Sequence, residues 1–122
     1  MKNIVLTLTI LLMLAGIAQA EPTKWVGFAS YYTEKSSSNL TASGERFDKT
    51  AFTCAIWNLP FNTILKVTNI ENHKFVLVRV NDRGVAKRLL KKGRIIDLTP
   101  RAFKEIAPLS QGLVRVKIEV IK

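Results

Sequence analysis

Short segments in which apolar and polar residues alternate recur along this chain of 122 residues, and they limit its possible folds more than any other feature. The clearest segment runs from Leu113 to Ile121, where valine or isoleucine stands at every even-numbered position. A period of two is typical of a strand with one buried face. Similar runs predict strands over residues 25–32, 52–57, 64–68, 75–80 and 94–98. The sequence therefore predicts a mainly β fold, a small β-barrel.

One segment has the pattern of a helix. Thr99 followed by Pro100 is typical of an N-cap and the first helical position. We expect this short helix to continue to about Ala107, because Pro108 disfavours helical backbone in the residue before it.

The connections between these segments are polar. Residues 71–73 are expected to form a hairpin turn that contains His73, and residues 81–84 a turn that closes the strand before them. Residues 85–93 carry Lys87, Arg88, Lys91 and Lys92, and we expect them to form a basic surface loop.

Cys54 is the single cysteine, so no internal disulfide can form. Its flanking residues are mostly apolar, which favours a buried, inert thiol over a nucleophile. With one cysteine and one histidine, the chain offers no cluster of typical metal ligands, so we expect neither a metal nor another cofactor.

Residues 1–20 have the three parts of a secretory signal peptide. Lys2 supplies the positive charge, residues 4–14 are apolar, and Ala18-Gln19-Ala20 is a cleavage-type tripeptide, so Glu21 would begin the mature chain. The alternative is a transmembrane anchor, but a membrane span needs about 20 apolar residues and this run is shorter. We expect residues 21–122 to form one domain that is periplasmic or secreted, with no stable membrane anchor.

The formal net charge of +10 bears on partners. Outside the cytoplasm, basic charge favours anionic cell-wall polymers, phospholipid headgroups or polyanionic glycans. Nucleic acid ranks last, because the export pattern is strong and no platform of aromatic and basic residues is visible. Basic residues that only keep the domain soluble would explain much of the same excess.

Four blocks of residues carry a resemblance to a known family. They are Gly27-Phe28-Ala29-Ser30-Tyr31-Tyr32, then Thr41-Ala42-Ser43-Gly44-Glu45-Arg46-Phe47-Asp48, then Leu59-Pro60-Phe61-Asn62-Thr63, and finally Val80-Asn81-Asp82-Arg83-Gly84 followed by residues 93–99. In this order the blocks resemble the rare lipoprotein A (RlpA) family. The resemblance covers about the whole of residues 21–122.

The resemblance implies a fold and an activity. The implied fold is a six-stranded double-psi β-barrel with one short helix, as in expansins. The implied activity is lytic cleavage of peptidoglycan glycan strands, in which the muramic 6-hydroxyl attacks its own anomeric carbon and leaves a 1,6-anhydro end. The partner would be the glycan strand, and we expect a monomer.

Two carboxylates are the candidate catalytic groups. Asp82 follows an apolar strand, and Glu45 ends a polar loop; a groove shared by two carboxyls supports acid and base chemistry at a glycosidic bond. The residues that the resemblance places in substrate binding are Asn81, Arg83, Tyr32 and Thr41.

Each carboxylate also has a structural interpretation. Asp82 could hydrogen-bond the backbone of its own turn. We expect Asp97 to be a partly buried partner of Arg83 or Arg94, and Asp48 to be a turn or capping group.

The chain departs from the family pattern at Ile56, where the family has a histidine. Isoleucine cannot hydrogen-bond or carry a proton. Val85 also stands where the family usually has proline. Three interpretations therefore stay open: a lytic transglycosylase, a non-catalytic peptidoglycan-binding or wall-loosening module, and a secreted effector or inhibitor built on the same barrel.

Overall fold

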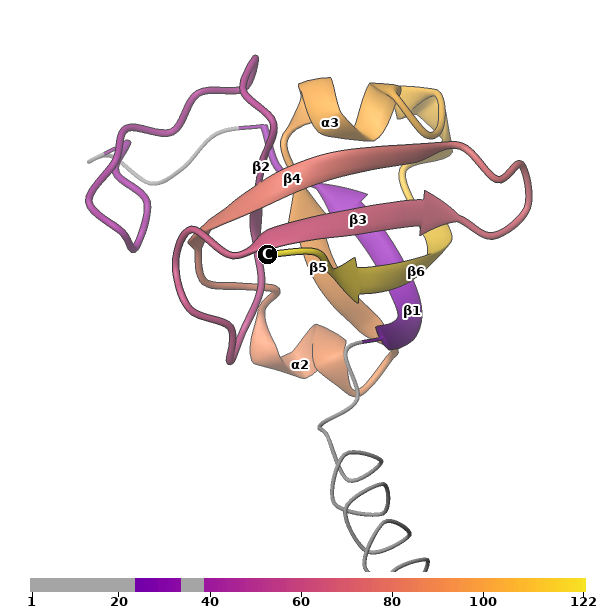
Figure 1. Ribbon diagram of the computed structural model, residues 1–122, viewed down its shortest axis with the longest axis horizontal. Helices are drawn as coiled ribbons and strands as arrows, with labels where there is room; N and C mark the ends of the chain where they lie inside the picture. Colours follow the sequence, from indigo (N-terminus) through magenta and orange to yellow (C-terminus); the bar gives the residue numbers. More distant parts are fainter. Residues whose placement is uncertain (1–23, 34–38) are drawn as a thin grey trace, which may run out of the picture.

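The computed structural model describes residues 24–33 and 39–122, and these residues form a closed barrel of six strands (Figure 1). The expected signal peptide, residues 1–20, lies outside the described residues. Within the described ranges, no helix has the length and apolar character needed to cross a membrane.

The strands pair in the order β1-β5-β2-β4-β3-β6, and β6 closes the barrel against β1. Their bounds are β1 Lys24–Tyr31, β2 Thr53–Ala55, β3 Ile64–Asn69, β4 Phe75–Asp82, β5 Arg94–Leu98 and β6 Val114–Val120. The pairs β1–β5 and β2–β4 are parallel and the other four are antiparallel. The expected mainly β barrel of six strands is thus confirmed.

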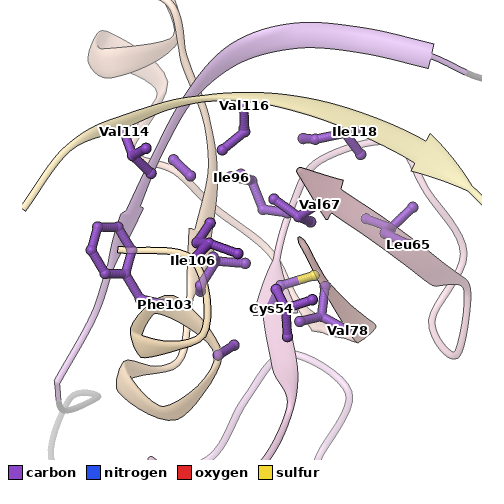
Figure 2. Packing of buried hydrophobic residues seen from close by; sticks show 14 of the residues in the cluster. Cys54, Leu65, Val67, Val78, Ile96, Phe103, Ile106, Val114, Val116 and Ile118 are labelled. Carbon is purple, nitrogen blue, oxygen red and sulfur yellow. The ribbon is translucent and has the colours of Figure 1, made fainter. Parts of the chain in front are cut away.

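Alternation along the strands places the core inside the barrel. In β4, Val76, Val78 and Val80 are buried, whereas Phe75 and Leu77 face outward. Figure 2 shows the packed interior, which contains residues of every strand and of the helix after β5. Its labelled members are Cys54, Leu65, Val67, Val78, Ile96, Phe103, Ile106, Val114, Val116 and Ile118.

The expected helix is confirmed but shorter. It is α3, Pro100–Lys104, and the Thr99 hydroxyl caps it by accepting the Ala102 N–H at 3.3 Å. Residues 105–107 form a turn instead of continuing the helix to Ala107. A separate 3₁₀ turn follows at Leu109–Gln111.

The prediction of a single helix was wrong, because the basic segment predicted as a surface loop over residues 85–93 contains a second one. Lys87–Leu90 forms a second short helix, α2, closed by the turn at Gly93, whose φ of 85° suits glycine. Lysine, arginine and leucine are good helix formers, so this segment adopts one turn of helix although it has no capping side chain.

The turn predicted for residues 81–84 begins later than expected. Asn81 and Asp82 continue β4, because the register against β2 shifts between Cys54 and Ala55. That irregularity places Asp82 opposite Ala55, so two residues that usually form turns stay within the sheet.

Three other predictions are confirmed. Cys54 is completely buried, and burial raises the pKa of its thiol. Asp97 pairs with Arg94 at 3.1 Å, and Asp48 accepts the Thr50 N–H at 2.9 Å in a local turn.

Candidate functional site

The candidate site lies where the loop of residues 40–46 packs over the end of β4. The loop is closed on itself, because the Thr41 N–H and hydroxyl both donate to the Glu45 carbonyl, at 2.8 and 2.9 Å. It is fixed to the strand by the Ser43 N–H, which donates to the Asn81 carbonyl at 3.2 Å. Thr41 and Glu45 are therefore held beside Asn81 and Asp82.

The Asp82 carboxylate is held by backbone groups. The residue is 2% exposed, and its Oδ1 accepts the Ala42 N–H at 2.9 Å and the Arg83 N–H at 2.8 Å. One donor comes from the loop and the other from the strand end, so the carboxylate joins the two segments. These two backbone hydrogen bonds fix the orientation of the carboxylate.

Glu45 forms an ion pair across the outer face of β4. Arg79 donates from Nη1 and Nη2 to the two carboxylate oxygens of Glu45, at 2.7 and 2.8 Å, and also donates to Asn62 Oδ1 at 3.0 Å. These hydrogen bonds lower the pKa of Glu45 to about 2, with smaller contributions from Asn81 and Ser43. Glu45, whose side chain is 41% exposed, therefore stays ionised to a lower pH than an unpaired glutamate.

The Glu45–Arg79 pair predicts a pH effect on stability. The pKa of Glu45 is lowered from 4.5 to about 2 on folding, so its stabilisation is present above about pH 5 and disappears as the pH falls toward 2. We expect the melting temperature of Glu45→Gln to lie below that of the wild type at pH 7, and the two to converge as the pH approaches 2. The difference should be modest, because solvent screens a pair this exposed.

Thermal unfolding followed by circular dichroism across this pH range measures the difference. Glu71→Gln, at an exposed turn position, is the control and should leave the melting temperature within the usual range for surface changes. A Glu45→Gln deficit that persists at pH 2 would contradict the assignment of the effect to the ionised pair.

The remaining predicted site residues divide into two groups. Tyr32 stacks on Phe47 with ring centroids 4.7 Å apart, and its pKa is raised by burial and by the nearby charge of Asp82. Arg83 points elsewhere, because its guanidinium lies 4.0 Å from the centroid of the Phe61 ring and donates to the Ile56 carbonyl at 3.3 Å. Thr41, Glu45, Asn81 and Asp82 thus form the centre of the candidate site, with Tyr32 beside Asp82.

Ile56 adjoins this centre through its main chain. Its N–H donates to the Asp82 carbonyl at 3.2 Å, but its side chain is only 8% exposed and packs in the core. That side chain also lines an apolar cavity of about 330 Å³ together with Trp25 and Leu90. Asp82 and Glu45 are absent from the described residues that line the cavity.

Sequence reasoning missed Arg79. The residue stands 34 positions from Glu45, so only the packing of the loop on β4 brings the two together. The sequence did contain one sign of it, because Arg79 is an outward-facing arginine in the apolar part of β4, and such a charge is often paired.

Comparisons with known proteins cover most of the described barrel. The lytic transglycolase family matches over residues 24–118. The chain is 41% identical over 96 residues to the endolytic peptidoglycan transglycosylase RlpA of Pasteurella multocida, covering 79% of this chain and 31% of that protein. It is 42% identical over 95 residues to the RlpA of Haemophilus influenzae, covering 78% and 32%. The chain thus spans about a third of the length of these relatives.

Solved structures with the same fold include a papain inhibitor and an expansin. The Streptomyces papain inhibitor is 25% identical, with a TM-score of 0.64, and the match covers 81% of this chain and 94% of the inhibitor. The apo expansin of Clavibacter michiganensis is 15% identical, with a TM-score of 0.61 over 81% of this chain and 50% of the expansin. The family match covers almost all of the described barrel, and from it the chain is a member of the lytic transglycolase family.

Proposed function

We propose that this chain is a peptidoglycan lytic transglycosylase domain that cleaves glycan strands and leaves 1,6-anhydro ends. The observation that carries the proposal is the junction of the 40–46 loop with β4, where a buried Asp82 carboxyl and an ionised Glu45 lie on adjoining segments. The names of the RlpA relatives support the substrate class.

The two carboxyls take different roles in this proposal. Glu45 is held in its charged form by the pair with Arg79, which lowers its pKa. Asp82, in its protonated form, donates a proton to the glycosidic oxygen as the bond to the anomeric carbon breaks. Its carboxylate then takes the proton of the muramic 6-hydroxyl as that oxygen bonds to the anomeric carbon. Glu45 stabilises the positive charge that develops on the sugar ring.

The direct test is mass spectrometry of purified glycan strands after incubation with residues 21–122. Products with 1,6-anhydro ends support the proposal. Reducing ends formed by hydrolysis, or strands that remain uncut, contradict it.

A second candidate function is binding of peptidoglycan without cleavage. Ile56 favours it, because a buried apolar side chain stands where the family has a proton-carrying histidine. A related solved structure, a mutant of the Clavibacter expansin in complex with cellohexaose, shows this fold in a polysaccharide complex. If wild-type protein binds strands without cutting them and Ile56→His gains cleavage, the binding function replaces the enzymatic one.

The proposal includes export. Residues 1–20 would be removed, and the product would act in the periplasm or outside the cell. We expect the intact mass of the protein recovered after expression with its own N-terminus to correspond to a chain that begins at Glu21. A mass that retains residues 1–20, or that includes a lipid, would contradict this expectation.

The basic side chains of α2 and the following turn provide a prediction about binding. Replacing Lys87, Arg88, Lys91 and Lys92 with serine should weaken retention on isolated sacculi, because these exposed cations would pair with anionic wall polymer. Retention of the wild type should also fall with salt, since the Debye length shrinks from about 10 Å at 0.1 M to about 3 Å at 1 M.

A sedimentation assay with sacculi at the two salt concentrations measures this effect. The matched control replaces Lys49, Lys66, Lys74 and Lys104, which removes the same charge from other parts of the surface. Equal losses in the two variants would show that only net charge matters.

A further inference from the structure

A cavity with mostly apolar lining lies at the end of the barrel where β1 begins. Trp25 near the start of β1 is the register partner of Ile118 on β6, and Ile118 is fully buried within the barrel. Trp25, Ile118 and Ile56 line the cavity of about 330 Å³ that opens at this end, and Leu90 of α2 lies at its edge. Figure 1 shows α2 at the same end of the barrel as the start of β1. Barrel mouths of this size are common small-molecule sites.

The aromatic wall of the cavity is held in place. The Trp57 indole Nε1–H donates to the Val85 carbonyl at 2.7 Å, so the ring is fixed between the segment after β2 and the segment before α2. Trp25, Val26 and Leu90 are exposed large apolar residues that line the same cavity. A cluster of exposed apolar side chains around a preformed hollow marks a binding site rather than incidental surface.

The charge at the rim is positive. The Lys87 ammonium lies 5.3 Å from the centroid of the Trp57 ring, which lines the cavity, and Arg88 and Lys91 are near Lys87 in sequence, on α2 and just after it. The described residues that line the cavity include no acidic side chain. The site therefore combines an apolar interior with a cationic rim, and that combination suits an alkyl chain with an anionic headgroup.

We propose that this cavity binds the alkyl chain of a single-chain anionic amphiphile in monomeric form, with the headgroup beside Lys87 and its basic neighbours on α2. Asp82 and Glu45 are not among the described residues that line this cavity, so it differs from the candidate glycan site, although Ile56 adjoins both. The proposal does not depend on glycan cleavage.

Tryptophan fluorescence reports directly on this cavity, because the chain has two tryptophans and both line it. We expect decyl phosphate, below its critical micelle concentration, to change the emission in a saturable way. Decyl maltoside and decyl trimethylammonium have the same chain with a neutral or cationic headgroup and should bind more weakly. Equal binding of all three would overturn the anionic headgroup, and no saturable change with decyl phosphate would overturn the site.

Two variants separate the apolar and ionic contributions. Leu90→Glu should weaken decyl phosphate binding by at least about tenfold, because it places an unpaired carboxylate at the apolar mouth. Lys87→Gln should weaken it by about threefold, the usual size for an exposed ionic contact, and leave decyl maltoside binding unchanged. Unchanged decyl phosphate binding in Leu90→Glu would overturn the proposal.

Leu77→Glu is the matched control. Leu77 is 48% exposed and Leu90 38%, but Leu77 lies on the outer face of β4, away from the cavity. It should bind decyl phosphate like the wild type. If Leu90→Glu does not fold, as judged by circular dichroism, Val26→Glu places the same charge at the cavity from β1. Anionic vesicles that shift the emission when decyl phosphate does not would overturn the proposal in favour of a membrane surface.

Discussion

Asp82→Asn should lower the rate of glycan cleavage by about 10²–10⁴-fold, the usual cost of removing a general acid or base. Asparagine keeps a side-chain oxygen that can still accept the Ala42 and Arg83 N–H groups, so the junction of loop and strand should survive. The amide cannot donate and recover a proton in the way that a carboxyl does. The measurement is the initial rate of 1,6-anhydro end formation from glycan strands.

Asp48→Asn is the control for this substitution. Asp48 is an exposed aspartate whose carboxylate accepts from Thr50 in a local turn, so the same chemical change there should leave the rate unaltered. Circular dichroism should give the same spectrum for both variants. Cleavage that survives Asp82→Asn would show that another group is the acid.

Phe103→Ala should destabilise the barrel by about 3–5 kcal/mol, the range for deleting a buried phenylalanine ring. Phe103 of α3 is fully buried in the core (Figure 2). The centroid of its ring lies 4.9 Å from that of Tyr31 on β1. Small domains have a total free energy of unfolding of about 5–15 kcal/mol, so this loss could unfold much of the population. The midpoint of urea denaturation measures it.

Phe52→Ala is the matched control, because it deletes the same ring from an exposed position. Its main contact with a charged group is Arg101, whose guanidinium lies 5.4 Å from the ring centroid. We expect a change of less than about 1 kcal/mol. Similar midpoints for the two variants would mean that Phe103 does not anchor α3 to the core.

The strands were predictable because one physical signal repeats in them. β4 and β6 each have one face in the barrel and one outside, so alternation locates both the strand and its buried face. The Thr99 cap was predictable for a similar reason, since a hydroxyl before proline has a defined role at a helix start.

The errors had one distant and one local cause. The irregular pairing of β4 with β2 keeps Asp82 in the strand, although aspartate beside asparagine is typical of a turn, and local residue preferences contain no information about that pairing. The α2 helix does follow the helix preference of its own residues, but no capping side chain marks its start.

The candidate site shows the same limit. The order of the blocks was enough to suggest Asp82 and Glu45 as partners in chemistry. Nothing local to Glu45 reveals the Arg79 guanidinium that keeps it ionised, because the two residues meet only after the loop closes over β4. The cavity could not be predicted from the sequence for the same reason, because Trp25, Trp57 and Leu90, which line it, come from three separated segments.

The closing pair of β1 and β6 governs when this barrel can form. The first described strand pairs only with β5 and β6, so Lys24–Tyr31 has no sheet partner until most of the chain has been synthesised. β6 also pairs with β3, so a chain that stopped before Val114 would leave two strands with unpaired edges at once. Unpaired edges are templates for aggregation. The presence of β6 therefore decides whether the domain is a closed barrel or an open sheet prone to associate with its neighbours.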